Sequence, residues 1–168
     1  NHIDFKIKNK CALDIGISTG GFSDVLLQNE ILHILGIDVG YGILDYKLRK
    51  SNNLSLLERT NAREVTKNEI NSTLAKHHLD INDVDLVVMD VSFISIFKII
   101  PNLLTLLKED CDYIILVKPQ FEAKKEMVEL GGVITNPTHL LEILNHVENK
   151  LIELGFEVLQ KEPSEIKG

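Results

Sequence analysis

Short apolar runs alternate with amphipathic segments along nearly the whole chain. The apolar runs have the length of strands, and the segments between them have the spacing of helices that cover a sheet. This alternation predicts an α/β fold, with a doubly wound and mostly parallel sheet covered by helices. The expected strands are residues 11–15, 31–37, 54–58, 85–90, 113–117 and 156–159, and the expected helices are 22–28, 66–78, 97–108 and 137–155.

Start and stop signals support two of the helices. Thr66 and Glu69 have the spacing of a capping box, so a helix is expected to begin there. Asn136 and Pro137 place a cap and a first helical residue in order. Gly155 then ends that helix about five turns later.

The turn after the first expected strand suggests a bound nucleotide. Residues 14–21 read DIGISTGG, and Ser18 interrupts the glycine spacing of dinucleotide-binding proteins. Asp14, two residues before the first glycine, suits a cationic ammonium better than a pyrophosphate. The pattern therefore favours S-adenosylmethionine over NAD, and Asp38, at the end of the next strand, is placed to hold a ribose diol. A tight turn that binds no ligand is the alternative.

Charged side chains also follow two later strands. Asp90 ends one apolar run and Lys118 ends another. Ligands of open α/β sheets bind beyond the carboxyl ends of the strands. Methyl transfer to a ribose hydroxyl needs in-line positioning and a base for a weakly acidic alcohol, and a lysine steadied by a carboxylate can serve as that base. From the residues alone, a structural ion pair is an equal alternative.

Composition indicates an ordinary globular domain. The 168 residues are 44% hydrophobic and 26% charged, and no apolar run approaches the length of a membrane span. Cys11 and Cys111 lack metal or disulfide spacing and are expected to be buried, reduced thiols of a cytoplasmic protein. The six histidines form no cluster with ligand spacing, so we expect no metal.

The net charge of −7 argues mildly against a stand-alone nucleic-acid binder. The charge is uneven, because residues 1–67 carry +1 and residues 68–168 carry −8. Five cations lie close together in the first part, and they form either a basic patch near the ligand pocket or a solvated face. They are Lys47, Arg49, Lys50, Arg59 and Arg63.

Several blocks of sequence together resemble the haemolysin-A (TlyA) family of FtsJ-like ribosomal RNA 2′-O-methyltransferases. The resemblance covers nearly all 168 residues, and it is most specific in the motifs VSFIS and KPQFE. The blocks are Leu13 to Leu27, Val39-Gly40-Tyr41-Gly42, Leu57 to Arg63, Asp85 to Ser95, Val117 to Glu122 and Gly131-Gly132-Val133.

The resemblance implies a Rossmann-like methyltransferase core. It implies methyl transfer from S-adenosylmethionine to cytidine ribose hydroxyls of ribosomal RNA, with ribosomal subunits as partners. The family's catalytic set is Lys-Asp-Lys-Glu, and its Asp and second Lys correspond to Asp90 and Lys118. Its first Lys would precede Asn1, its Glu would follow Gly168, and an S4-type RNA-binding domain lies upstream in relatives. We therefore expect residues 1–10 to be a lead-in and residues 11–168 to be a core that lacks its last strand.

The resemblance also assigns residues around the cofactor. Six of them would contact the methionine moiety. Asp38 would hold the ribose, and Val39 would flank the ribose. Asn61 and Ala62 would lie near the adenine. Phe93 and Phe121 would stack on a splayed base, or else only hold their loops to the core. The six are Asp14, Gly16, Ser18, Thr19, Gly20 and Gly21.

Three other functions compete with this interpretation. The name haemolysin suggests a membrane-lytic protein, but the chain has no spanning segment and no strongly basic amphipathic helix. A cofactor-binding core that is inactive alone is the second alternative, and an NAD-dependent enzyme, disfavoured by the glycine spacing, is the third. The sequence does not determine the oligomeric state.

Overall fold

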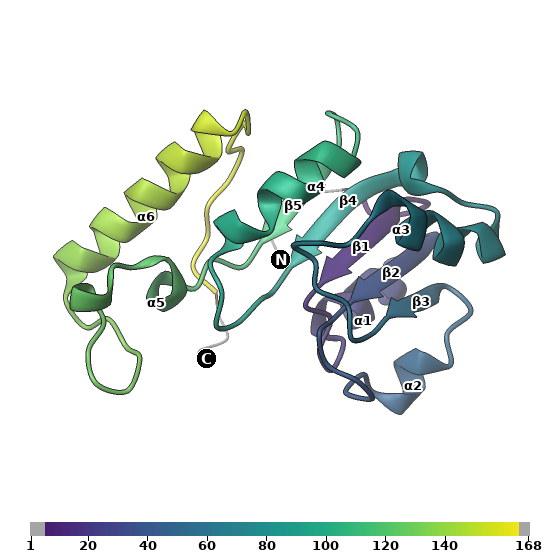
Figure 1. The fold of residues 1–168 in the computed structure, drawn as a ribbon, viewed down its shortest axis with the longest axis horizontal. Helices are drawn as coiled ribbons and strands as arrows, with labels where there is room; N and C mark the ends of the chain where they lie inside the picture. Colours follow the sequence, from purple (N-terminus) through teal and green to yellow (C-terminus); the bar gives the residue numbers. More distant parts are fainter. Residues whose placement is uncertain (1–5, 165–168) are drawn as a thin grey trace. The chain divides into compact units, whose positions relative to one another are not determined.

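The computed structural model describes residues 6–164 (Figure 1). These residues form two compact units. The larger, called here the sheet unit, comprises residues 6–91 and 96–115, and the C-terminal unit comprises residues 92–95 and 116–164. Each is described by itself.

The sheet unit is built on five parallel strands in the order β3-β2-β1-β4-β5. This is the expected doubly wound α/β fold, in which the strand order reverses between β1 and β4. In folds of this kind, ligands bind at the carboxyl ends of the two strands between which the order reverses. The strands are β1 (Cys11–Ile15), β2 (His33–Ile37), β3 (Leu54–Leu57), β4 (Val84–Met89) and β5 (Asp112–Ile115).

The helices begin where the capping signals predict. The Thr66 hydroxyl accepts from the amide of Glu69 and the Glu69 carboxylate accepts from Thr66, so the expected capping box is formed. The side chain of Asn136 accepts from the first amides of the long C-terminal helix. The helices are α1 (Gly21–Gln28), α2 (Tyr46–Arg49), α3 (Lys67–Leu74), α4 (Ile100–Leu106), α5 (Pro119–Glu122) and α6 (Pro137–Glu153).

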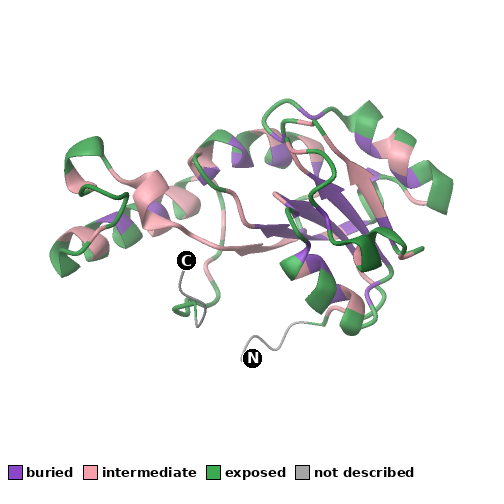
Figure 2. Cartoon of the chain, turned by 90° about the horizontal axis from the view of Figure 1, so that it is seen from below, coloured by how far each residue is buried: buried purple, intermediate pink, exposed green. Residues whose placement is uncertain are grey.

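Buried residues gather on the central strands (Figure 2). Every residue of β1 and β2 is buried, as strands covered by helices on both faces require. Leu13, Ile34 and Leu86 are fully buried, and each such side chain contributes about 1.5–3 kcal/mol to stability. Cys11 and Cys111 are buried free thiols, as expected.

Two expectations differ from the structure. The strand expected at residues 156–159 is not formed, because the amide of Phe156 donates to the carbonyl of Leu151 and closes α6 instead of joining a sheet ladder. The short helices α2 and α5 were not expected. In α2 the side chain of Asp45 accepts from the amide of Lys47, and this cap starts a helix without any apolar periodicity.

Candidate functional site: the carboxyl edge of the sheet

The glycine turn after β1 is shaped by close backbone packing. Gly16 has a φ of 79°, and its amide donates to the carbonyl of Ile37 at 2.9 Å. A Cβ on Gly16 would overlap the carbonyl oxygen of Asp90. Asp90 in turn donates its amide to Ile15 at 3.0 Å, so the ends of β1 and β4 are tied together at the switch point.

At position 20, backbone conformation and neighbouring side chains require a glycine. Its φ is 100°, and a Cβ there would overlap the side chains of Leu44 and Leu48. Gly21, the first residue of α1, has open space around its Cβ position. Of these two glycines, Gly21 is the one whose α-carbon faces space that a ligand could fill.

Asp14 lies inside β1 and is not at its carboxyl end. The side chain is 1% exposed, and one carboxylate oxygen accepts from the hydroxyl of Ser23 at 2.7 Å. Burial raises the pKa of Asp14 to about 6, although the bond from Ser23 acts in the opposite direction. Asp14 thus lies one residue before the end of the strand expected at residues 11–15.

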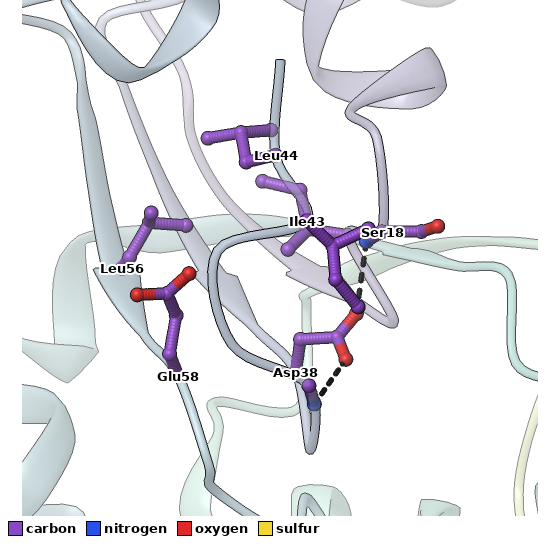
Figure 3. Close-up of a pocket in the computed structure, with 8 residues that line it drawn as sticks. Ser18, Asp38, Ile43, Leu44, Leu56 and Glu58 are labelled. Atoms are coloured by element: carbon purple, nitrogen blue, oxygen red, sulfur yellow. Dashed lines mark hydrogen bonds between the residues drawn. The ribbon is translucent and has the colours of Figure 1, made fainter. Parts of the chain in front are cut away.

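Asp38 follows β2 directly and is fixed by two backbone amides (Figure 3). The amide of Ser18 donates to Oδ2 at 2.8 Å, and that of Gly40 donates to Oδ1 at 2.7 Å. Ser18 adopts a positive φ of 50°, which an L residue holds at a cost and which aims its amide at the carboxylate. Each oxygen keeps lone pairs for a further donor, as a ribose diol requires.

Glu58 lies at the carboxyl edge of the sheet beside Asp38, and the sequence analysis did not predict it as a site residue. It follows β3 directly and accepts from the amide of Gly42 at 2.8 Å and from the guanidinium of Arg49 at 2.5 and 3.3 Å. These hydrogen bonds, led by that from Arg49, lower the pKa of Glu58. Its position at the end of a strand was the signal that could have identified it.

A small cavity adjoins Asp38. It encloses about 10 Å³, which is the space of one water molecule. The loop after β2 supplies much of its wall, and Figure 3 shows the Ile43 and Leu44 side chains from this loop near Ser18 and Asp38. The lining residues are Ile17, Ser18, Asp38, Gly40, Ile43, Leu44, Leu56 and Glu58.

The other expected cofactor residues lie on the loops that follow the strands. Val39 is 72% exposed, and Thr19 accepts through its carbonyl from the amide of Asp45 at 3.2 Å. Asn61 accepts from the amide of Arg63 at 3.1 Å, and this contact forms a turn. Ala62 is buried, and its carbonyl accepts from Asn102.

The two expected catalytic residues belong to different units. Asp90 directly follows β4 in the sheet unit. Lys118 lies three residues beyond the end of β5, in the C-terminal unit, and its ammonium donates to the hydroxyl of Ser92 at 2.8 Å. Their pairing stays a prediction.

The C-terminal unit also brings two motif residues together. The rings of Phe93 and Phe121 lie 5.4 Å apart at 49°. Phe93 is 91% exposed and has a φ of 65°, a conformation that is strained for an aromatic residue. The hydroxyl of Ser95 donates to Glu122 at 2.6 Å. These contacts fix the residues of VSFIS against those of KPQFE.

Two features of the described residues bear on the competing functions. Among residues 6–164, no three His, Cys, Asp or Glu side chains are grouped in a way that could hold a metal ion. No helix in the same range combines the length and the apolar character that crossing a bilayer requires.

Comparison with known proteins gives consistent relatives. The model of the FtsJ-like methyltransferase family matches residues 1–168. Hemolysin A of Brachyspira hyodysenteriae is 38% identical over 162 residues, which cover 96% of this chain and 64% of that protein. The 16S/23S rRNA (cytidine-2′-O)-methyltransferase TlyA of Mycobacterium tuberculosis is also 38% identical, over 96% of this chain and 57% of that protein.

A solved structure agrees with these relatives. The structure of a hemolysin-type protein from Streptococcus thermophilus superposes with a TM-score of 0.88 at 31% identity, over 98% of this chain and 56% of that one. The chain thus spans between 56% and 64% of the length of these three proteins.

Proposed function

Since this chain belongs to the FtsJ-like methyltransferase family, we propose that it forms the catalytic core of an enzyme that methylates ribosomal RNA at the ribose 2′-hydroxyl of cytidine. S-adenosylmethionine is the cofactor. The observation that carries the proposal is the carboxylate of Asp38, held by the amides of Ser18 and Gly40 beside the glycine turn. Its 38% identical relative in M. tuberculosis is named for this reaction.

The residues at the carboxyl edge fit the cofactor. Asp38 offers acceptors for the ribose hydroxyls, and the open side of Gly21 leaves room at the start of α1. Asp14 and the turn residues Gly16, Ser18, Thr19 and Gly20 border the methionine end. Val39, Asn61 and Ala62 follow β2 and β3, where the adenine would lie.

Binding requires a side chain in the cavity wall to move. A nucleoside is far larger than the cavity of about 10 Å³ beside Asp38. Ile43 and Leu44 line this cavity from the loop after β2, but Leu44 is buried in the core whereas Ile43 is 49% exposed, so the Ile43 side chain is the part of the wall that can move. We expect this side chain to turn outward while the loop backbone and the amide of Ser18 keep Asp38 in place.

The chain's own residues supply what the reaction needs beyond the methyl donor. S-adenosylmethionine, when bound, supplies a methyl group on a good leaving group, so little covalent help is required. Lys118, as the free amine, takes the proton of the ribose hydroxyl, and Ser92 orients the lysine nitrogen. Asp90 steadies the charge at the reacting end. Phe93 receives the splayed base beside Phe121.

Transfer of tritium from labelled S-adenosylmethionine to purified ribosomal subunits tests the proposal. The full-length M. tuberculosis relative serves as the positive control, and calorimetry with S-adenosylmethionine and NAD checks the cofactor. We expect cofactor binding by this chain but slow transfer, because the family's remaining catalytic residues and RNA-binding domain lie outside it. Preferential binding of NAD, or release of dye from lipid vesicles without methylation, would contradict the proposal.

A further inference from the structure

One exposed face of the sheet unit is positively charged although the chain is acidic. Residues 41–63 contain five Lys or Arg and two Asp or Glu, a net charge of +3, whereas the whole chain has −7. All five cations are exposed, and α2, which carries two of them, has no buried residue. We call this surface the 41–63 face; its cations are Lys47, Arg49, Lys50, Arg59 and Arg63.

Two exposed tyrosines on this face are each stacked with a cation. The guanidinium of Arg59 lies 4.4 Å from the ring centre of Tyr41, and the ammonium of Lys50 lies 4.1 Å from that of Tyr46. Tyr41 is 66% exposed and Tyr46 is 69% exposed. Tyrosines that served only to fill the core would be buried, so these rings are available to a partner.

Hydrogen bonds hold the first of these pairs in place. The amide of Arg59 donates to the carbonyl of Gly40 at 3.0 Å, and the amide of Gly42 donates to Glu58 at 2.8 Å. The loop that carries Tyr41 is thereby joined to the loop that carries Arg59 on both sides of the tyrosine. A platform fixed in advance loses less conformational entropy when a ligand stacks on it.

The 41–63 face is also built onto the candidate cofactor turn. The side chains of Leu44 and Leu48 pack against Gly20, and the amide of Asp45 donates to the carbonyl of Thr19. A partner bound to α2 would therefore lie next to the methyl donor.

We propose that the 41–63 face is an RNA-binding surface of this domain, in which Lys50 and Arg59 contact phosphates and Tyr41 and Tyr46 stack with unpaired bases. The proposal rests on the proposed function for the identity of the RNA. Cations alone would also suit an acidic protein. Cations paired with exposed aromatic rings are specifically suited to nucleic acid, because the phosphate and the base of one nucleotide use both groups.

The test measures binding of a fluorescein-labelled single-stranded RNA by anisotropy at several salt concentrations. The variants are Lys50→Ala/Arg59→Ala and Tyr41→Leu, and Tyr41→Phe keeps the ring. Lys8→Ala/Lys76→Ala is the matched control, because it removes the same charge from exposed lysines that are outside the face.

Loss of two phosphate contacts should reduce the steepness of the plot of log binding constant against log salt concentration by about 1.4, because each phosphate contact on a single strand contributes about 0.7. Tyr41→Leu should weaken binding by about fivefold or more, the effect of one lost base stack, and Tyr41→Phe should restore it. The control variant should bind as the parent does. Equal affinity of the parent and the Lys50→Ala/Arg59→Ala variant, or no RNA binding by the parent, would overturn the proposal.

Two further measurements separate this proposal from the proposed function. Calorimetry with S-adenosylmethionine should give the same affinity for all variants. If the parent binds the cofactor but the face does not bind RNA, only the RNA surface is refuted. If the parent binds RNA through this face but does not bind the cofactor, the methyltransferase proposal fails instead. Equal competition by polyglutamate and by RNA of matched charge would show a general polyanion site and refute base stacking.

Discussion

Gly16 touches the backbone of Asp90 so closely that no side chain fits between them. The contact joins the end of β1 to the end of β4, and the carbonyl of Asp90 occupies the place where a Cβ on Gly16 would be. The glycine turn and the acidic end of β4 are therefore one structural element. A change at either residue should displace the other.

Gly16→Ala should unfold more easily and lose cofactor affinity. A non-glycine residue at this positive φ costs about 1–2 kcal/mol, and the overlap with Asp90 adds to that cost. Gly42→Ala is the matched control, because Gly42 has a similar φ of 72° but open space around its Cβ position. Urea unfolding of both variants isolates the contribution of Asp90, and equal destabilisation of the two would show that the overlap relaxes without cost.

Gly20→Val and Gly21→Val should fail in different ways. Valine at Gly20 meets Leu44 and Leu48 at a positive φ, so that variant should be destabilised. Gly21 begins α1 and has open space around it, so its variant should remain folded but lose binding of S-adenosylmethionine. Circular dichroism followed by calorimetry distinguishes the two effects. Unchanged cofactor affinity in a folded Gly21→Val variant would remove Gly21 from the site.

Asp38→Ala should weaken cofactor binding by about 1–3 kcal/mol, the cost of removing a charged hydrogen-bond partner. The amides of Ser18 and Gly40 would also lose their acceptor, so some of the effect should appear as local loosening of the loop. Asp45→Ala, which removes an exposed helix cap nearby, is the control. Calorimetry should show a large loss of cofactor affinity for Asp38→Ala and none for Asp45→Ala. Parental affinity in that variant would exclude Asp38 as the ribose ligand.

Asp14→Asn should stabilise the protein relative to the parent at pH 7 more than at pH 4. Burial raises the folded-state pKa of Asp14 to about 6, above its ordinary value, so the folded state favours the protonated carboxyl. The contribution of Asp14 is therefore fully present below the unfolded-state pKa and is lost as the pH rises through 6. Asparagine keeps a neutral partner for Ser23 at every pH.

Urea unfolding of both proteins between pH 4 and pH 7 measures that difference. Comparison with the parent is needed because the titration of His33 changes the stability in the opposite direction. Burial and the nearby His77 lower the pKa of His33 to about 4, so its contribution to stability is lost as the pH falls. Subtraction of the parent's curve cancels this shared contribution. A difference that does not depend on pH would show that folding leaves the pKa of Asp14 unchanged.

Local patterns in the sequence predicted much of the fold. The capping residues Thr66 and Asn136 fix helix starts through contacts within a few residues, and such signals can be read from sequence. The strand expected near Phe156 failed because pairing with a distant neighbour decides whether an apolar run becomes a strand. Asp38 was placed correctly after β2, because a charged residue that ends an apolar run marks the strand end.

The rest of the site depends on side-chain contacts that the spacing of residues along the sequence does not reveal. The clash between a side chain at Gly20 and Leu48 comes from the unexpected helix α2, so sequence reasoning attributed that glycine to the ligand alone. Likewise, the bond from Ser23 to Asp14 requires the start of α1 to lie over β1. Side-chain partners of this kind follow from packing rather than from order along the chain.

Lys118→Ala should abolish methyl transfer and leave cofactor affinity nearly unchanged, because the group acts on the ribose hydroxyl and not on the cofactor. A positioned general base contributes about 10²- to 10⁴-fold to the rate. Ser92→Ala, which removes the acceptor of the lysine ammonium, should give a smaller loss, and Lys124→Ala is the exposed control. Tritium transfer and calorimetry in the full-length protein measure both quantities. Loss of cofactor binding in a folded Lys118→Ala variant would make Lys118 a binding residue, and retained transfer would remove it from the reaction.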